Sequence, residues 1–447
     1  MSSVHVEAAA DLISPDAATL ASLPLPLAQR IFLALPVDAR GRASCVCRAW
    51  RDVLAEPALW TRLDMSDVDV EWQRFAAMLH GAAGRAHGQL SNLDLSQRHV
   101  TKEVLLPMLT ANAGSLRELH LKFLSTSLYS VKDLKAVVVA APLLQVLTAE
   151  EVSCKWEEAP RLLRAEPPFA ALQMRRSLEV RFSGQGTRHG GMERVGPFAV
   201  ALADAALRPA LCHVCVSDAD IAQPALMGAL VDAAVARRLR ELKFSGCTPP
   251  DAASLARLLA QGSLSVLHFS SSHGEVFDAA GAAALVADAL RVNTTLTELM
   301  LCEAYLCADM SGTGVLLGAL VGHPSLRGIV IIGEEPAERD RVVFGAALAA
   351  LIAADAPALR DLTCYNTALG DEGLEPIVEA LALNRHLADL DVCGNGISEA
   401  FARERLLPAV RANTGLRELK VNDDLDDEVV PAAAEAEELV RRRAQQS

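Results

Sequence analysis

The apolar positions between Leu20 and Leu63 change their spacing twice, which is typical of three short helices packed into one cluster. Pro24 and Pro26 stand where a first helix would begin, because proline is tolerated in a first helical turn. The apolar residues that follow at helical spacing are Leu27, Ile31, Phe32 and Leu35. Their spacing places them on one face of that helix.

Two further helices are predicted before Leu63. Pro36 and Asp38 end the first helix and cap a second one that runs through Arg42 to Val46. The inward positions of the third helix are Val46, Cys47, Trp50, Val53 and Leu54, and the segment closes with Leu59, Trp60 and Leu63. A unit of about forty-five residues buries too little surface to be stable alone, so it should pack against a neighbouring domain or a partner.

The order of these residues resembles the F-box. The matching pieces are Leu23-Pro24, Ile31-Phe32, Leu35-Pro36, the run Val46 to Arg51, and Leu59-Trp60. The resemblance implies a small helical fold that binds a Skp-type adaptor and thereby docks on a cullin-based ubiquitin ligase. The adaptor-binding residues it implies are Leu23, Pro24, Leu27, Ile31, Phe32, Leu35, Pro36, Val46, Cys47, Trp50, Leu59 and Trp60. The sequence departs from the family at Pro26, where an acid is common, and at residues 39–41, where a leucine pair is common.

A second pattern, with leucine-like residues at positions one, four and six, recurs from Leu90 onward. Its eleven clear copies begin at Leu90, Leu116, Leu144, Leu211, Leu239, Leu264, Leu296, Leu326, Leu359, Leu387 and Leu416. A twelfth, degraded copy is expected around Leu178, Val180 and Phe182. Each copy predicts a short strand, and an alanine- and leucine-rich helix such as residues 344–354 follows it. A strand and a helix at a period of about 28 residues are the leucine-rich-repeat signature.

The stretch from Leu369 to Ser398 resembles the ribonuclease-inhibitor-like subclass of leucine-rich repeats. Asn395 stands where that subclass places a buried turn asparagine, and Cys247 stands where it allows cysteine. Other repeats depart at this position, with Arg98, Ala304 and Glu334. The predicted fold class is an α/β solenoid, a leucine-rich-repeat horseshoe of about 12 strand–helix units behind a small N-terminal three-helix F-box.

The domain organisation follows from these two patterns. We expect a flexible tail over residues 1–19, the F-box over 20–66, a linker or cap over 67–89 and the repeats over 90–424. An irregular insertion covers about residues 151–197, and a charged tail or helix covers residues 425–447. Acids at the start of that last segment and three arginines at its end suit a helix dipole, which predicts a solvated terminal helix.

Strand residues at positions three, five and seven of each repeat should face the inner surface of the array. Acids predominate there: Asp94, Glu118, Glu150, Glu241, Glu298, Asp361, Asp389, Asp391 and Glu418, against Lys122, Lys243 and Lys420. The candidate substrate-binding residues are Asp94, Glu118, His120, Glu241, Lys243, His268, Glu298, Asp361, Tyr365, Asp389, Asp391 and Glu418. Such a face would attract a basic segment of a protein substrate. The simpler alternative is that these residues are solvated and bind nothing, because the whole chain is acidic.

Composition narrows the possible partners. The net charge of −14 argues against nucleic acid and against an anionic membrane surface, both of which call for basic residues. Hydrophobic residues make up 51% of the 447 residues and aromatic residues only 4%, which indicates a helix-rich core of small side chains. No leader or long apolar run is visible at the N-terminus, and the ten cysteines are expected to be free thiols in the cytoplasm or nucleus.

Two weaker patterns, a glycine-rich loop and a pair of cysteines, are candidate ligand sites. Gly184, Gly186 and Gly190 follow a strand, but their spacing is wrong for a nucleotide-binding loop and no lysine follows, so a flexible loop is preferred. Cys212 and Cys215 have the spacing of metal ligands without a second pair nearby, so packed thiols are preferred. We therefore expect no metal and no cofactor.

No motif of a hydrolase, metalloprotease or phosphate-binding loop is present in the sequence. The leading hypothesis is a non-catalytic, substrate-recognition subunit of a cullin-based ligase of the SCF type. The alternative is a leucine-rich-repeat scaffold or inhibitor whose F-box-like segment only caps the solenoid. Exposed apolar surface on residues 20–66 would favour the first, and its burial would favour the second.

Overall fold

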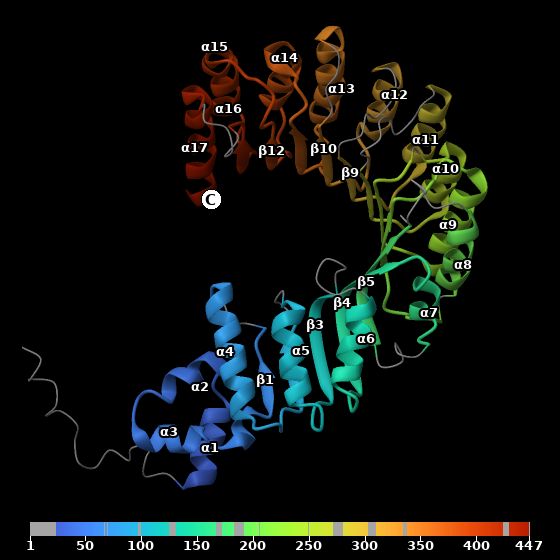
Figure 1. Ribbon diagram of the computed structural model, residues 1–447. Helices are drawn as coiled ribbons and strands as arrows, with labels where there is room; N and C mark the ends of the chain where they lie inside the picture. Colours follow the sequence, from blue (N-terminus) through green and yellow to red (C-terminus); the bar gives the residue numbers. More distant parts are fainter. Residues whose placement is uncertain are drawn as a thin grey trace, which may run out of the picture. The chain divides into compact units, whose positions relative to one another are not determined.

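The computed structural model of the protein is an α/β solenoid in which short strands alternate with helices (Figure 1). The chain forms two compact units: residues 1–151 with 168–173, and residues 152–167 with 174–447. The structure describes residues 24–66, 68, 70–96, 100–124, 131–166, 172–182, 192–204, 206–248, 250–270, 280–302, 310–333, 338–422 and 429–446. The expected N-terminal tail over residues 1–19 lies outside them, as does Leu23.

The first unit begins with the three expected short helices. These are α1 (Leu25–Leu33), α2 (Val37–Ala43) and α3 (Arg48–Leu54), followed by the 3-10 helix η2 (Pro57–Trp60). Pro36 directly precedes α2, and Pro57 opens η2, where its fixed φ suits a helical first turn. The Sγ of Cys47 accepts a hydrogen bond of 3.5 Å from the amide N–H of Trp50 at the start of α3.

The repeats of the first unit place their strands side by side in chain order. The strands are β1 (Arg62–Asp64), β2 (Asn92–Leu95), β3 (Glu118–Leu124) and β4 (Val146–Lys155), and the helices are α4 (Trp72–Arg85), α5 (Lys102–Ala111) and α6 (Val131–Ala140). Leu63 of β1 pairs in register with Leu93, so Trp60 occupies the position that Leu90 holds in the next repeat. Strand β1 is not predicted from the sequence, because the apolar pattern places Leu59 to Leu63 wholly in the helical cluster.

The second unit continues the alternation with nine strands among its described residues. They are β5 (Leu172–Arg181), β6 (His213–Ser217), β7 (Glu241–Ser245), β8 (Val266–Ser270), β9 (Glu298–Cys302), β10 (Gly328–Ile332), β11 (Asp361–Tyr365), β12 (Asp389–Asp391) and β13 (Glu418–Lys420). The strands from β5 to β13 pair in parallel with their neighbours and follow in chain order. Leu178 and Val180 pair with Val214 and Val216, which confirms the degraded twelfth copy.

The strands are connected by helices that pack on one face of the sheet. They are α7 (Ala159–Leu163), α8 (Met192–Ala203), α9 (Pro224–Arg237), α10 (Ala252–Gln261), α11 (Ala280–Val292), α12 (Met310–Leu320), η4 (Glu338–Asp340), α13 (Arg341–Ala353), α14 (Gly370–Leu381), α15 (Glu399–Phe401), the π-helical turn η5 (Ala402–Leu406), α16 (Leu407–Ala412) and α17 (Pro431–Gln446). Alternate strand residues such as Leu299 and Leu301 are buried beneath them. The helices α9 to α14 carry mainly alanine, leucine and valine, and these small apolar side chains fill the core.

Buried asparagines connect one repeat of the second unit to the next. The Oδ1 atoms of Asn293, Asn384 and Asn413 each accept a hydrogen bond from the leucine amide three residues later, at 2.7 to 2.8 Å. Their Nδ2 groups donate to carbonyl oxygens at the end of the preceding helix, at 2.6 to 2.7 Å. These bonds satisfy buried backbone groups that would otherwise lack partners. The sequence analysis missed this second asparagine series, although the recurring Asn-x-x-Leu spacing marks it.

Asn395 is the buried turn residue that the sequence predicts. Its Nδ2 donates to the carbonyl oxygens of Cys364 and Val392 at 2.6 and 2.8 Å, and its Oδ1 accepts from the hydroxyl of Thr367 at 2.6 Å. Cys247 occupies the corresponding place after β7, five strands earlier, where its thiol lies 3.3 Å from the carbonyl oxygen of Val216. The Arg98, Ala304 and Glu334 positions lie outside the described residues.

The C-terminal helix α17 differs from its prediction. It was expected to be solvated, but Ala432, Ala433, Ala436 and Val440 are buried at 0 to 1% exposure. These small residues recur at helical spacing and form one packing face, which the high charge of the segment obscured. Glu437 accepts hydrogen bonds of 2.6 and 2.9 Å from the amides of Val421 and Asn422, so α17 covers backbone donors after the last strand.

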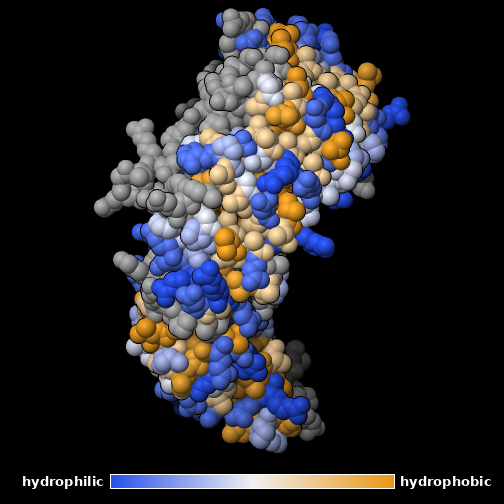
Figure 2. Space-filling view, turned by 90° about the vertical axis from the view of Figure 1, so that its right-hand side faces the viewer, coloured by the Kyte–Doolittle hydropathy of each residue, from blue (hydrophilic) through white to orange (hydrophobic). Residues whose placement is uncertain are grey.

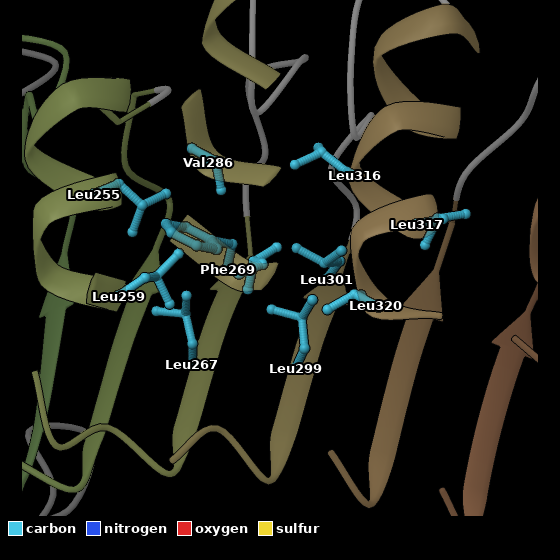
Figure 3. Close-up of a pocket in the computed structure, with 11 residues that line it drawn as sticks. Leu255, Leu259, Leu267, Phe269, Val286, Leu299, Leu301, Leu316, Leu317 and Leu320 are labelled. Atoms are coloured by element: carbon cyan, nitrogen blue, oxygen red, sulfur yellow. The ribbon is translucent and has the colours of Figure 1, made fainter. Parts of the chain in front are cut away.

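The aliphatic core of the second unit leaves a small cavity between β8, β9 and the helices α10, α11 and α12 (Figure 3). The cavity holds about 30 Å³ and is lined only by apolar side chains. Its lining residues are Leu255, Leu259, Leu267, Phe269, Val286, Leu290, Leu299, Leu301, Leu316, Leu317 and Leu320. A wholly apolar cavity of this size is expected to stay dry, because a water there would find no hydrogen-bond partner.

Candidate functional site

The core of the helical cluster contains several residues that the sequence assigned to adaptor binding. Phe32, Leu59 and Trp60 are each only 1% exposed. The indole N–H of Trp60 donates to the carbonyl oxygen of Leu54 at 2.7 Å, and the guanidinium of Arg85 lies 4.8 Å from its ring centre. These three residues hold the fold and offer no surface to a partner. Their assignment as adaptor contacts is corrected for this reason.

Arg40 lies in the stretch that departs from the F-box pattern, and its side chain links separate parts of the helical cluster. Its guanidinium donates hydrogen bonds to the carbonyl oxygens of Leu33, Leu35 and Leu59 at 3.1, 2.9 and 2.7 Å. The residue is 7% exposed, and burial lowers the pKa of Arg40. One side chain therefore satisfies carbonyl groups at the end of α1 and in η2, a role that no apolar residue could fill.

The exposed apolar residues of this cluster gather on α1 and before α3. Their exposed fractions are 53% for Leu25, 47% for Leu27, 40% for Ile31, 48% for Leu33 and 64% for Val46. Leu27 and Ile31 are four residues apart on α1 and so lie on one face of the helix. We call Leu27, Ile31 and Val46 the apolar surface of the cluster. Exposed large apolar residues are informative when several occur within so short a segment.

The remaining adaptor candidates are divided between surface and interior. Pro24, Pro36 and Cys47 are exposed, whereas Leu35 and Trp50 are half-buried. Trp50 packs edge-on against Phe32, with ring centres 5.6 Å apart. Leu25 and Leu33 were missed by the sequence analysis because they fall off the predicted apolar face of α1.

Exposed apolar residues on and just after the helices of the second unit provide a contrast. Val200, Val292 and Leu383 are exposed by 69%, 68% and 81%. On the face shown in Figure 2, orange residues are interspersed with blue ones. Single exposed apolar side chains are normal on a protein surface and carry no functional argument.

The first unit brings three of the substrate-binding candidates together on β2 and β3. Asp94 and His120 are paired in register, and Glu118 lies two residues before His120 on the same strand. The Nδ1 of His120 is 2.6 Å from the hydroxyl oxygen of Thr148. Glu118 accepts a hydrogen bond of 2.5 Å from the side-chain amide Nδ2 of Asn92. These polar groups already have partners within the strand face.

The second unit places the other nine candidates on the strand face turned away from the helices. They are Glu241 and Lys243 on β7, His268 on β8, Glu298 on β9, Asp361 and Tyr365 on β11, Asp389 and Asp391 on β12, and Glu418 on β13. The register aligns Glu241, Val266, Glu298, Gly328, Asp361, Asp389 and Glu418 in one row across seven strands. The predicted concentration of acids on this face is therefore present.

Some of these acids are neutralised by neighbouring cations. Glu241 lies 3.0 Å from the Nδ1 of His213 and 2.8 Å from the Nζ of Lys243. Glu418 pairs with Lys420 at 2.8 Å. Pairing reduces the net charge at both ends of the row, so the formal count of acids overstates the negative potential there.

Three acids in the middle of the row lack such a cation. Within the described part of the chain, no lysine, arginine or histidine lies within ion-pair distance of Glu298, Asp361 or Asp389. Partial burial, with the neighbouring carboxylates of Asp361 and Glu418, raises the pKa of Asp389 to about 6. The negative potential of this strand face is therefore concentrated on β9 to β12.

His268 has a different character from the acids. Burial, and secondarily the charge of Lys243, lowers the pKa of His268, so it is neutral at physiological pH. Neither of its ring nitrogens has a hydrogen-bond partner in the described part of the chain. It contributes to packing on β8 and adds no positive charge to the face.

Two further sequence patterns concern metal and nucleotide ligands. The described residues contain no cluster of three or more potential metal ligands. Burial raises the pKa of Cys215 to about 11, so its side chain is a neutral thiol at physiological pH. The glycine-rich loop at residues 183–191 lies outside the described residues. Every helix described is too short or too polar to cross a membrane.

Comparison with known proteins identifies the N-terminal segment. Residues 20–66 match the F-box-like family model. These residues form an F-box-like domain. The chain is also similar to the putative F-box/LRR-repeat protein 22 of Arabidopsis thaliana, with 30% identity over 157 residues, which are 34% of this chain and 50% of that protein. The chain thus matches about half the length of this curated relative.

The fold and the comparisons agree. An F-box-like domain of three short helices precedes strand–helix units of the leucine-rich-repeat type, as the sequence predicts. Trp60 belongs to both, because it fills the core of the F-box-like domain and stands at the first position of the repeat that contains β1. The F-box-like domain is therefore continuous with the array through one shared aromatic residue.

Proposed function

We propose that this protein is the non-catalytic, substrate-recognition subunit of a cullin-based ubiquitin ligase of the SCF type. The F-box-like domain would bind a Skp-type adaptor, and the repeats would bind the protein to be modified. The chain would contribute no reacting group, since its role is to hold substrate lysines near the ubiquitin-carrying enzyme. The single observation that carries the proposal is the apolar surface of Leu27, Ile31 and Val46 on the F-box-like domain.

An apolar surface on this domain supports the receptor over the alternative function. A segment that served only as a cap would bury its apolar residues against the first repeat. Leu59 and Trp60 do so, but Leu27, Ile31 and Val46 are 40 to 64% exposed. The domain thus covers the end of the array and still leaves apolar side chains for a partner.

Co-expression of the full chain with a Skp-type adaptor tests the proposal. We expect the two to co-elute in size-exclusion chromatography, and we expect the double variant Leu27→Asp, Ile31→Asp to elute alone. Val139→Asp is the matched control, because Val139 is 78% exposed on α6 of the same unit and lies far along the chain from the F-box-like domain. Failure of the unmodified chain to co-elute would contradict the receptor and favour a scaffold with a capping domain.

A further inference from the structure

We propose that the strand face of β9, β10 and β11 binds an extended segment of a protein by seating one arginine or lysine side chain between Glu298 and Asp361. This inference rests on the proposed function, because it gives the chemistry of the substrate that the repeats would hold. The seat is the position over Gly328, which we call the Gly328 notch.

The notch exists because a glycine stands between two acids. Glu298, Gly328 and Asp361 are direct register partners on three adjacent strands. The atoms nearest to a Cβ added at Gly328 would belong to the side chains of Glu298 and Asp361, at 3.8 Å. That distance is ordinary van der Waals contact, so one carbon atom placed over the buried Gly328 would touch both acids without strain.

The charge of the notch is complementary to a cation. Glu298, Asp361 and the adjacent Asp389 have no cation within ion-pair distance among the described residues, in contrast to Glu241 and Glu418. Partial burial raises the pKa of Asp389 to about 6, together with a side-chain hydrogen bond to Asp361 and repulsion from the carboxylates of Asp361 and Glu418. A guanidinium or ammonium group would relieve the repulsion and donate hydrogen bonds to several carboxylate oxygens at once.

Apolar side chains continue from the notch along β10. Val330 and Ile332 lie two and four residues after Gly328 on the same face, and Met300 is the register partner of Val330. All three are half-buried. Side chains of an extended segment alternate with a period of two, so a segment aligned with β10 would present apolar residues two and four positions from its basic residue. This spacing defines the predicted ligand.

Selection of random peptides displayed on phage against the full chain tests the proposal. We expect enriched peptides to carry arginine or lysine with apolar residues at alternate positions. Affinity of a synthetic enriched peptide would then be measured by fluorescence anisotropy. Enrichment of peptides without a basic residue would overturn the proposal.

The variant Gly328→Arg tests the notch directly, because it supplies the cation from the chain itself. We expect unchanged or higher thermal stability and about tenfold weaker peptide binding. Gly328→Ala, which fills only the floor of the notch, should weaken binding about two- to fivefold. Glu404→Gln, at an exposed acid on the helical side of the array, is the control and should bind like the unmodified chain. Unchanged affinity of a folded Gly328→Arg variant would contradict the seat.

Further measurements distinguish the possible reasons for a negative binding result. Asp361→Lys should shift the selected peptides from basic to acidic residues, and retention of basic peptides would contradict the proposal. A dimer seen by light scattering and abolished by Gly328→Arg would show that a second copy of the chain is the occupant, which also overturns it. Co-elution with the Skp-type adaptor, measured on the same samples, reports on the proposed function independently of the notch.

Discussion

The F-box-like domain and the strand face of the second unit present opposite kinds of surface. Leu27, Ile31 and Val46 expose uncharged side chains, whereas Glu298 and Asp361 expose carboxylates without a cation in the described residues. Apolar contacts are insensitive to salt, and charged contacts weaken as salt screens them. The comparison indicates that the two proposed partners are held by different forces, and salt should distinguish them.

The cores beneath these surfaces differ as well. Phe32, Trp50 and Trp60 fill the F-box-like domain with aromatic rings, and Trp60 forms a buried hydrogen bond. Around β8 and β9 the core is mainly leucine, with Phe269 stacked on Phe244, and it leaves a cavity of about 30 Å³. A small domain depends on each large side chain, whereas a long array shares its stability among many similar repeats.

The largest expected effect is on the aromatic core. Trp60→Ala should lower the free energy of unfolding by about 3–5 kcal/mol, because it removes a buried aromatic residue and its hydrogen bond. Chemical denaturation followed by circular dichroism would measure this. Trp72→Ala is the control, since Trp72 is 41% exposed, and should cost much less. Equal losses in the two variants would contradict the special role of Trp60.

A smaller effect is expected at the turn asparagine of the array. Asn395→Ala should cost about 2–4 kcal/mol, since it leaves buried carbonyl and amide groups without hydrogen-bond partners. The same denaturation measurement applies, with Gln261→Ala as an exposed amide control. A loss below about 1 kcal/mol would show that neighbouring groups replace the asparagine.

The cavity predicts a gain in stability. The Val286 side chain points into the cavity in Figure 3, so Val286→Leu should fill part of it. We expect a gain of about 0.5–1 kcal/mol in the free energy of unfolding. The matched variant Val292→Leu, at an exposed position of the same helix, should have no effect. A loss on filling would mean that the space is already packed tightly.

The smallest expected effect concerns pH. The pKa of Asp389 is raised to about 6 in the folded chain, above the value of about 3.9 for an unfolded one, so the folded state binds the proton more tightly. This contribution to stability is complete below about pH 4 and is lost as pH rises through about 6. Discounted for solvent screening, it is about 0.5–1 kcal/mol. Asp389→Asn should therefore flatten the pH dependence of the melting temperature between these limits, and an unchanged profile would contradict the coupling.

Much of the fold follows from residue spacing alone. The three helices near the N-terminus, the repeating strands and the buried Asn395 were all predicted from local patterns. Strand β1 was missed because Trp60 serves two structures at once, and the packing of α17 was missed because four small residues hide among many charges. These errors arise where tertiary contacts, rather than local periodicity, decide the outcome.

The binding surfaces were only partly predictable. The sequence pointed to residues 20–66 as a candidate binding segment but could not separate buried Phe32 from exposed Ile31, since both are apolar and adjacent. It counted the acids of the strand face without their partners, so it could not tell that Lys243 neutralises Glu241 while Asp361 stays without a cation. Gly328 carried no signal, because its importance comes from the register of neighbouring strands.

The most direct test of the central claim is the dissociation constant of the full chain for a Skp-type adaptor at low and high salt. We predict a change of less than about threefold between about 50 and 500 mM salt, because the contact is apolar. Ile31→Asp should weaken binding about a hundredfold, while Val139→Asp should leave it unchanged. Tight binding by Ile31→Asp, or no measurable binding by the unmodified chain, would contradict the role assigned to the F-box-like domain.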